Sequence, residues 1–546
     1  MWLHEIGGAV LAIRRRYGRI LPLTAALLAL GFILPETATS ARASDGDTIV
    51  ATEQIQASEA TVVTPRGNDQ SKDTREARGA LRTETAQKLG DARDVQPQKR
   101  PKTGGMETSY ARPPASRQSF EGPNQGTLPD LPPDTHGAVG LRHFVEVTNG
   151  TGLGIFRKSD GANVATVSLA SFFGYTTTRI FDPRVVYDKQ RDRWVVVAEA
   201  FPEPNTTVQN VFLAVSTTSD PTGSFFVYRM DVPEGADFFD YPQLGLNEDA
   251  VIITGSIFDS ADVYLRTRAF GIPKSAIYRG AGFSIPYFNL GSPGTVAPPI
   301  VEDGSPNAFL LSASVTAPNA LRLFRARGLG TPDATIAPAI DVPVPTFAAP
   351  PAARQPGVAD RLDALDGRFQ NASTQIGNQL LNVHSIATGG GGFPTPRWYQ
   401  INTTTATVPA GRSGLVFESS DSDDFNPAVV GSSVGGTRDN PIGRMFFTWS
   451  ATDVLGTDLH QARVKGASRF ATDPVNVTGG TTFAEATAPY NPSPLPIERW
   501  GDYSAVTIDP VRDRCRSGNG QSAWLVNERH TTPTQWGSRI GRLGLC

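Results

Sequence analysis

The sequence predicts an all-β protein whose main part is a single β-propeller, with seven blades as the expected number. Beyond about residue 125, short runs of β-branched and aromatic residues alternate with Gly, Pro, Asn and Asp, as in strands separated by turns. The 54 glycines and 43 prolines fit a chain that turns often. One unit also recurs through this region, and such recurrence is typical of a repeat architecture.

The repeated unit consists of a polar residue that opens a short apolar strand, a turn, and a second strand rich in Val, Phe and Trp. Its clearest copy reads FDPRVVYDKQRDRWVVVAEA, from Phe181, and its second strand is almost wholly apolar, as expected when neighbouring blades cover both faces. The copies start about 50 to 75 residues apart, which suits a four-stranded blade with loop insertions. The seven starts are Pro133, Phe181, Asp240, Ala297, Leu365, Phe425 and Arg499.

Closure of these units into a ring explains the repeat. A ring removes the edge strands that an open sheet would expose. A pair of β-sandwiches would also be rich in short strands, but it does not predict seven copies of one opening motif. Rings of six or eight blades are the alternatives to seven.

The N-terminal residues have the parts of an export signal. Arg14–Arg16 and Arg19 precede an apolar stretch over 20–34. Small residues follow and end in Ala41-Arg42-Ala43, which fits a cleavage site, and the apolar stretch is shorter than the ~20 residues of a spanning helix. We therefore predict a signal peptide over 1–43, a secreted or periplasmic (cell-envelope) protein, and no stable membrane span after cleavage. An uncleaved membrane anchor is the alternative.

Residues 44–124 show almost no apolar periodicity and are rich in charged and polar side chains. A segment of this kind buries too little surface to offset the entropy lost on ordering. We therefore predict a disordered tether over 44–124, followed by the propeller domain over 125–546.

The two cysteines, Cys515 and Cys546, lie close to the C-terminal end of the sequence. After export they would form one disulfide on the last blade, and closing a loop of that size stabilises the fold by roughly 3–4 kcal/mol. A redox or nucleophilic cysteine is the alternative, but neither residue belongs to a CxxC motif or has a recognisable histidine partner.

Net charge excludes one class of partner. The chain carries a formal charge of -3, and its arginines are scattered among acidic residues. Nucleic-acid binding requires a dense basic face, so we expect no nucleic-acid partner.

Several short motifs resemble those of secreted bacterial β-propeller proteins that are loosely allied to the sialidase-like superfamily and largely uncharacterised. They are Asp182-Pro183-Arg184-Val185, Asp240-Tyr241-Pro242, Asp366-Gly367-Arg368, and Trp500-Gly501-Asp502-Tyr503-Ser504 with Asp509-Pro510. The resemblance covers roughly residues 130–546 and implies the propeller fold. The sequence contains no Asp-box turn of the kind that sialidases carry, and their arginine triad and nucleophilic tyrosine have no assignable counterparts, so sialidase activity is not implied.

Polar residues recur where the units enter their first strands, at Asp134, Asp182, Asp240, Asp366, Asn426 and Asp502. Alignment of the units would bring these positions to one mouth of the central channel, where carboxylates, guanidinium groups and aromatic rings suit a sugar, a polar peptide or a cation. The residues expected to contact a ligand are Asp134, His136, Asp182, Arg184, Asp240, Tyr241, Arg368, Arg499, Trp500 and Asp502. A structural role competes with this hypothesis, because a recurring Asp also caps turns and accepts backbone N–H groups between blades.

Other chemistries have little support. The six histidines form no HExxH motif, and the sequence contains no GxSxG, so neither a zinc site nor a serine nucleophile is predicted. The acidic run Asp421–Asp424 resembles a fragment of a calcium loop but lacks the glycine and glutamate of that motif. We therefore expect no cofactor, with a structural calcium ion as the open alternative.

Three functions follow from these observations. The first is an exported, non-catalytic propeller that binds an extracellular glycan or protein at its axial mouth. The second is an extracellular glycoside hydrolase or lyase that uses carboxylates among Asp182, Asp240 and Asp502. The third is a purely structural scaffold. The sequence leaves the choice between an enzyme and a binding protein open.

Overall fold

The computed structural model is almost entirely β. It describes residues 48–65, 68–69, 118–126, 131–313, 317–455, 458–513 and 520–545. In these ranges the helical segments are short: α1 (Leu169–Phe173), α2 (Lys274–Ile277) and the 3-10 turn η2 (Gly389–Gly391). No helix of the described part is both long and apolar enough to cross a bilayer. The predicted signal peptide over 1–43 and the predicted pair Cys515–Cys546 lie outside the described residues.

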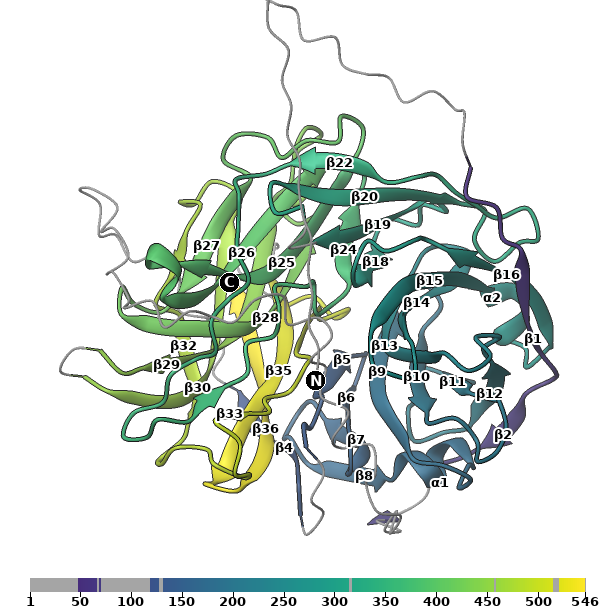
Figure 1. Ribbon diagram of the computed structural model, residues 1–546, viewed down its shortest axis with the longest axis horizontal. Helices are drawn as coiled ribbons and strands as arrows, with labels where there is room; N and C mark the ends of the chain where they lie inside the picture. The colour runs from purple at the N-terminus through teal and green to yellow at the C-terminus, as the bar shows by residue number, and fades with distance from the viewer. Residues whose placement is uncertain are drawn as a thin grey trace, which may run out of the picture. The chain divides into compact units, whose positions relative to one another are not determined.

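The strands fall into successive antiparallel sheets that follow the chain order (Figure 1). The first sheet contains β5 (His136–Val139), β6 (His143–Thr148), β7 (Gly152–Arg157) and β8 (Asn163–Val167). The second contains β9 (Ile180–Asp188), β10 (Arg193–Ala200), β11 (Asn210–Ser216) and β12 (Phe225–Asp231). The third contains β13 (Phe238–Leu246), β14 (Ala250–Phe258), β15 (Tyr264–Pro273) and β16 (Phe283–Asn289).

The fifth sheet is joined to the third by a short strand, β18 (Pro299–Val301), which pairs in parallel with both β13 and β24, whereas the fourth sheet is separate. The fourth sheet contains β17 (Val296–Ala297), β19 (Ala308–Ala313), β20 (Ala320–Arg327), β21 (Thr335–Ile336) and β22 (Ile340–Pro343). The fifth contains β24 (Ser373–Ile376), β25 (Gln379–Thr388), β26 (Phe393–Asn402) and β27 (Ser413–Phe417), with β31 (Val477–Thr478) added to β27.

The last two sheets complete the series. The sixth contains β28 (Ser422–Ser432), β29 (Arg444–Asp453), β30 (His460–Phe470) and β32 (Thr481–Glu485). The seventh contains β34 (Ala505–Ile508), β35 (Gln521–Thr532), β36 (Gln535–Leu545) and β4 (Ser119–Asn124). A separate parallel pair joins β23 (Arg361–Leu362) to β33 (Ile497–Glu498).

The first strands of the sheets form a closed circuit. Each contacts its neighbour in the order β5, β9, β13, β18, β24, β28 and β34, and β34 contacts β5 again. Figure 1 shows the sheets following one another around this circuit. The all-β propeller predicted from the repeat is therefore confirmed.

Hydrophobic cores lie between consecutive sheets. Val145 of the first sheet packs in one cluster with Trp194 of the second, and both are fully buried. Another cluster joins Phe144 of the first sheet to Trp524 of the seventh. The seventh sheet therefore packs against the first, as the first packs against the second. Each sheet is covered on both faces, which explains why the second strand of a unit is apolar on both faces.

The N-terminal segment adds strands to the outer edges of several sheets. β1 (Glu53–Ala57) pairs with β16, β2 (Thr61–Val63) pairs with β12, and β3 (Asn68–Asp69) pairs with β8. Ile49 also forms an isolated bridge with Ile336 of the fourth sheet. Residues 49–69 therefore follow the edges of the fourth, third, second and first sheets in turn.

The disorder expected over 44–124 does not hold for residues 48–65 or for β4. Ile55 is buried in the core of the second and third sheets, and the backbone of this segment pairs with strands that would otherwise be exposed edges. Such pairing uses main-chain groups and needs little apolar periodicity, so the composition of the segment did not indicate it. Residues 44–47, 66–67 and 70–117 of that range lie outside the described residues.

Candidate functional site

Two of the recurrent opening residues, Asp182 and Asn426, lie in bulges of first strands, and Tyr241 lies in a third bulge of this kind. Asp182, Tyr241 and Asn426 each precede a proline, and each has a positive φ, of 52°, 61° and 47° respectively. At these points the pairing register shifts, so that two residues of the first strand face one residue of the second. Asp and Asn tolerate this left-handed backbone better than most residues, which gives the repeated polar residue a structural reason.

Asp134 connects the first sheet to the last. It also has a positive φ, of 47°, and it is buried. Its Oδ1 accepts a hydrogen bond of 2.9 Å from the Asp502 backbone N–H, and its Oδ2 accepts one of 2.5 Å from Asn149 Nδ2. Burial, and then the Asp502 and Asp182 carboxylates, raise the pKa of Asp134 well above its usual range.

Arg184 lies inside this cluster, and two of its guanidinium nitrogens donate hydrogen bonds to backbone carbonyls. Its Nε donates to the Pro242 carbonyl and its Nη1 to the Gln370 carbonyl, both at 2.9 Å. Its guanidinium carbon lies 3.3 Å from the ring centroid of Tyr503. Tyr503 in turn donates its hydroxyl proton to Asp182 Oδ2. These contacts position Arg184 as a tie between the second, third and fifth sheets.

Tyr241 and Arg368 stack against each other near the same mouth. The Arg368 guanidinium carbon lies 4.6 Å from the Tyr241 ring centroid, and Arg368 Nε donates to Asp366 Oδ1 at 2.8 Å. The Tyr241 hydroxyl donates to the Asp502 carbonyl at 3.2 Å. Both side chains are buried, so their contacts stabilise the structure around the mouth rather than form its surface.

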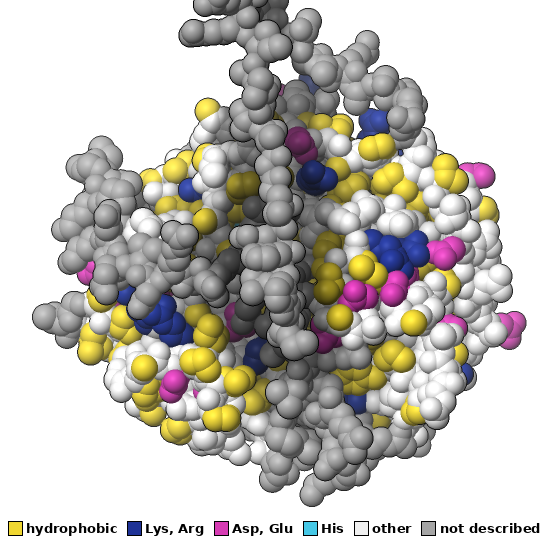
Figure 2. All heavy atoms as spheres, in the orientation of Figure 1, with side chains coloured by type: hydrophobic (Ala, Val, Ile, Leu, Met, Phe, Trp, Pro, Cys, Tyr) yellow, Lys and Arg dark blue, Asp and Glu magenta, His cyan; other side chains and the backbone are white. Residues whose placement is uncertain are grey.

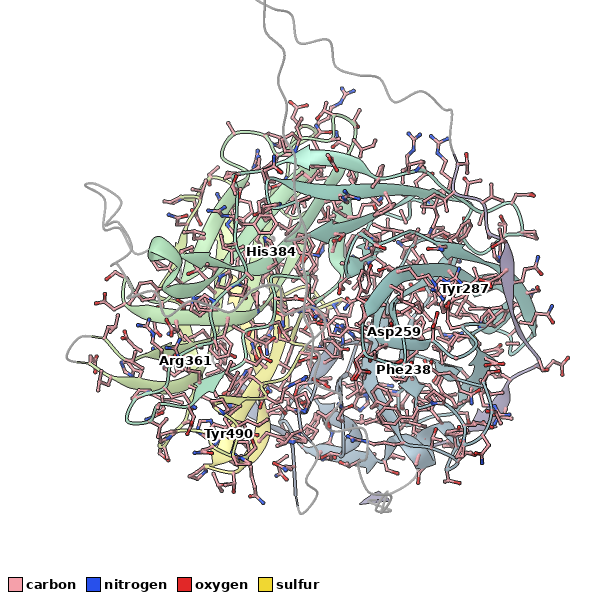
Figure 3. All side chains as sticks on the ribbon, in the orientation of Figure 1. Phe238, Asp259, Tyr287, Arg361, His384 and Tyr490 are labelled. Atoms are coloured by element: carbon pink, nitrogen blue, oxygen red, sulfur yellow. The ribbon has the colours of Figure 1, made fainter. Side chains whose placement is uncertain are left out.

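The histidines of this region are held neutral by the fold. His136 Nδ1 accepts a hydrogen bond of 3.3 Å from the Val185 backbone N–H, and burial, followed by Arg184, lowers the pKa of His136 well below its usual range. His384, labelled in Figure 3, lies against Phe347 and Phe369, and burial lowers its pKa to about 4. Neither imidazole faces a ligand site.

Trp500 and Arg499 differ in exposure. Trp500 is buried, its Nε1 donates to Ser450 Oγ at 3.2 Å, and its ring meets Tyr490 (Figure 3) edge-on at 5.7 Å. The Arg499 side chain is 26% exposed and its Nη2 lies 3.0 Å from Asp502 Oδ1. Among the predicted ligand contacts, only Asp240 and Arg499 are partly exposed, as is Asp366 beside them.

The structure therefore brings most of the predicted residues together, but mainly as a network of buried contacts between sheets. It also reveals buried carboxyl groups that the repeat did not indicate: Glu146 on β6, Glu199 on β10 and Glu528 on β35. Burial is the largest cause that raises the pKa of all three. A signal existed in the sequence for Glu146 and Glu199, because each is an acidic residue inside a strand that is otherwise mostly apolar, whereas the strand of Glu528 is largely polar.

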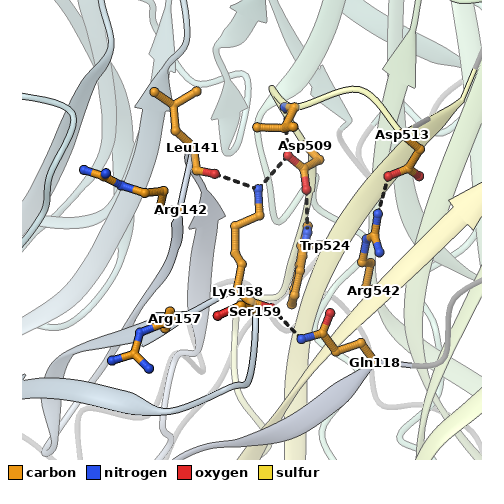
Figure 4. A pocket seen from close by; sticks show the side chains of 11 residues that line it. Gln118, Leu141, Arg142, Arg157, Lys158, Ser159, Asp509, Asp513, Trp524 and Arg542 are labelled. Atoms are coloured by element: carbon orange, nitrogen blue, oxygen red, sulfur yellow. Dashed lines mark hydrogen bonds and ion pairs between the residues drawn. The ribbon is translucent and has the colours of Figure 1, made fainter.

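A separate pocket lies between the first and seventh sheets (Figure 4). Its volume is about 460 Å³, and its lining includes the cationic residues Arg142, Arg157, Lys158 and Arg542 and the acidic residues Asp509 and Asp513. Within the pocket, Lys158 Nζ lies 2.7 Å from Asp509 Oδ1, and Trp524 Nε1 donates to Asp509 Oδ2 at 2.8 Å. Arg542 pairs with Asp513.

Two arginines that line this pocket, Arg142 and Arg157, do not pair with the acidic residues of its lining. The Arg142 side chain is exposed, and its guanidinium group has no hydrogen bond or ion pair with any described residue, whereas Arg157 pairs with Asp160, outside the pocket lining, at 2.7 Å. Leu141, Val511 and Trp524 add apolar surface. No local pattern in the sequence indicates this site, because its residues come from loops and strand ends of two sheets that are far apart in the chain.

The first strands also line a second, smaller cavity. Its volume is about 60 Å³, and it is lined mainly by strand residues such as Ala138, Val186, Val429 and Val506. The face shown in Figure 2 carries its charged side chains in small mixed groups rather than as one basic field. The observed charge pattern on that face gives no support to a nucleic-acid partner.

No known sequence family and no curated protein matches the chain. Among solved structures, it is similar to an exo-β-1,3-galactanase from Phanerochaete chrysosporium bound to galactose, with a TM-score of 0.31 and 11% identity over 64% of this chain and 80% of that one. It is also similar to an exo-β-1,3-galactanase from Clostridium thermocellum, with a TM-score of 0.28 and 11% identity over 64% and 83%. An ACO/RPE65 chimera gives a TM-score of 0.35 and 11% identity over 62% and 69%. Similarities at this level carry no functional conclusion, and the resemblance to sialidase-like propellers stays a prediction.

Proposed function

We propose that this chain is an exported, seven-bladed β-propeller that binds an acidic glycan, without catalysis, in the pocket between its first and seventh sheets. The seven successive sheets correspond in order to the seven repeat units, which supports the blade count. Export follows from the N-terminal pattern, and it would bring the pocket into contact with extracellular polysaccharide.

The observation that carries the proposal is the pair Arg142 and Arg157 on the wall of a pocket of about 460 Å³. A carboxylated sugar offers both a negative charge for these guanidinium groups and hydroxyls for neighbouring polar side chains. Apolar surface from Leu141, Val511 and Trp524 suits the C–H faces of a sugar ring. A pocket of this size fits a small saccharide, whereas a protein partner would need a much wider contact area.

The axial mouth predicted from the sequence is a weaker place for a ligand. Its buried members bond to one another, so a ligand there would contact mainly the rim formed by Asp240, Asp366 and Arg499. The rim is the part of the original hypothesis that we retain.

The proposal is tested by calorimetric titration of the full chain with acidic oligosaccharides, such as oligogalacturonates, and with neutral ones of the same length. We expect acidic ligands to bind preferentially and added salt to weaken them. The double variant Arg142→Ala/Arg157→Ala should lower the affinity at least about tenfold, which corresponds to about 1.4 kcal/mol.

The matched control replaces two exposed arginines outside the pocket, Arg191→Ala/Arg229→Ala, and should bind as the wild type does. Equal affinity for neutral and acidic ligands, or an unchanged affinity in the pocket variant, would contradict the proposal.

The hydrolase alternative also has one observation in its favour. Asp134, with a raised pKa, lies beside Asp502 and Asp182, and glycoside hydrolysis uses a pair of carboxyl groups of which one has a raised pKa. Product formation on the same oligosaccharide panel, lost in Asp502→Asn, would establish this function instead. Burial of Asp134 and Asp502 favours the binding function.

A further inference from the structure

Three carboxyl groups from the second and third sheets converge beside the axial mouth. Asp182 of β9, Glu199 of β10 and Asp240 of β13 each place a carboxylate oxygen within 4.8 Å of the other two. Asp182 and Glu199 are buried, and Asp240 is partly exposed.

The backbone imposes this convergence. Asp182 sits in the bulge of β9, and Glu199 pairs with Phe181 next to that bulge. Asp240 directly precedes the corresponding bulge of β13, at Tyr241. The Tyr241 backbone N–H lies 3.0 Å from Glu199 Oε1 and 2.9 Å from Asp240 Oδ1, so it donates toward both carboxylates and holds them side by side.

Glu199 accepts a hydrogen bond from the Tyr241 backbone N–H but has no cationic partner among the described residues. It is 0% exposed, and its Oε2 is buried without a hydrogen-bond partner among the described residues. No lysine or arginine of the described part forms an ion pair with it. Burial, then the Asp240 and Asp182 carboxylates, raise the pKa of Glu199 well above its usual range.

The buried Glu234 and the partly buried Glu418 show the usual solution, whereas the buried Glu146 and Glu528 have no cationic partner among the described residues. Glu234 lies 2.6 Å from the Nε of Arg268 and also pairs with Arg266. Glu418 pairs with Lys465 at 2.8 Å. A buried carboxylate ordinarily needs a cationic side chain or a bound metal ion beside it. Glu199 has no such lysine or arginine partner among the described residues.

We propose that Asp182, Glu199 and Asp240 together bind a divalent cation, with Ca²⁺ as the ion they fit best. The group offers carboxylate oxygens alone, which are hard ligands suited to Ca²⁺ rather than to zinc or copper. Ca²⁺–oxygen distances of about 2.3–2.6 Å place ligands on opposite sides of one ion about 5 Å apart, so the observed spacing accommodates it. Two positive charges would offset most of the negative charge of three carboxylates, and the exposed side of Asp240 gives the ion a route from solvent.

Such an ion would join neighbouring blades. Its ligands come from the first two strands of the second sheet and from the first strand of the third, so binding would tie two sheets together where they meet the channel. Binding to the folded chain alone stabilises it by mass action, so the melting temperature should depend on Ca²⁺ concentration.

The test starts from full-length protein treated with EDTA and then dialysed. Titration with CaCl₂ at pH 7 should show one ion bound per chain, and millimolar Ca²⁺ should raise the melting temperature by several degrees. Tb³⁺, which replaces Ca²⁺ in oxygen sites, should give sensitised emission on tyrosine excitation, because Tyr503 bonds to Asp182 and Tyr241 follows Asp240.

Glu199→Gln keeps the shape of the side chain and removes its charge, so it should weaken Ca²⁺ binding at least about tenfold and abolish the melting shift. Glu528→Gln is the matched control, since Glu528 is also a fully buried glutamate on a second strand but is not part of the cluster. It should bind Ca²⁺ and Tb³⁺ as the wild type does.

If Glu199→Gln fails to fold, as judged by near-ultraviolet circular dichroism, Asp240→Asn at the partly exposed position carries the test, with the same expected loss. A folded wild-type protein that binds no Ca²⁺ at millimolar concentration overturns the proposal and indicates a proton shared between Glu199 and Asp240. Wild-type affinity in the folded Glu199→Gln or Asp240→Asn variant overturns it as well. These outcomes are independent of glycan binding in the other pocket.

Discussion

At the scale of single residues, one backbone conformation accounts for the most conspicuous pattern in the sequence. Asp182 and Asn426 recur because each occupies a left-handed position where a first strand bulges, and Asp134 occupies a left-handed position just before the first strand β5. Their side chains then bond across to neighbouring sheets, as Asp134 does to Asp502. The same geometry that favours these residues structurally also gathers carboxylates at one mouth, so structural and ligand-binding roles coincide there.

Glu528 gives a prediction for stability against pH. It is buried, its Oε2 accepts from the Gly501 N–H, its Oε1 has no partner among the described residues, and burial raises its pKa well above the usual 4.5. The fold therefore favours the protonated form, whose stabilising contribution is complete below pH 4.5 and is lost as the pH rises through the folded-state pKa. Glu528→Gln cannot ionise, so its free energy of unfolding should fall less than that of the wild type from pH 4 upward.

Urea unfolding at intervals between about pH 4 and pH 8 measures this difference. Glu59→Gln is the control, because Glu59 is exposed and its variant should follow the wild-type profile. Parallel profiles for Glu528→Gln and the wild type would show that folding does not raise the pKa of Glu528.

At the scale of elements, strands with a clear run of apolar residues were predictable from the sequence. Strands that are held mainly by backbone pairing with the edge of another sheet were not. The run 193–198 was expected to be a strand covered on both faces, and it lies inside β10 with its apolar side chains buried. β1 and β2 have no comparable pattern, because they are added to finished sheets through backbone hydrogen bonds. The pocket at Arg142 could not be predicted for a similar reason, since no local sequence pattern indicates which loops of distant sheets come together.

Ile55 gives a prediction at this scale. It is 1% exposed and packs in the core of the second and third sheets, although it belongs to a segment expected to be disordered. Ile55→Ala should lower the free energy of unfolding by about 2–4 kcal/mol, the usual cost of truncating a buried isoleucine. Val62 on the adjacent strand β2 is 63% exposed, so Val62→Ala should change it by less than about 0.5 kcal/mol.

Denaturant unfolding with both variants measures these costs, and hydrogen exchange should show protected amides in β1. Equal, small effects of the two substitutions would mean that this segment is not docked in solution.

At the scale of the whole molecule, closure depends on a strand that the repeat does not contain. The seventh sheet takes β34, β35 and β36 from the C-terminal unit, but its outer strand, β4, comes from residues 119–124. Phe120 of β4 lies between Phe156 of the first sheet and Trp524 of the seventh, with ring centroids 5.7 and 5.9 Å away. Seven repeats predicted a ring, but only the structure shows that the chain closes it from its N-terminal side.

A truncation series tests this closure. A chain that starts at residue 48 keeps every described strand, one that starts at residue 118 loses β1–β3, and one that starts at residue 127 also loses β4. We expect the first to behave as a monomer of full stability and the second as a less stable monomer. The third should self-associate, because the removal of β4 leaves the long strand β36 (Gln535–Leu545) as an unpaired edge. Size-exclusion chromatography with light scattering, together with thermal unfolding, measures both properties.

The chains that start at residues 118 and 127 form the critical pair, since they differ by β4 and its flanks. A peptide of residues 118–126, added in trans, should return the shorter chain toward the monomer by pairing with β36. The same peptide restores Gln118 to the pocket lining, so acidic-glycan binding should be weakened in the shorter chain and recover with the peptide. A monomeric, fully stable chain from residue 127 would show that the C-terminal unit closes the ring without β4.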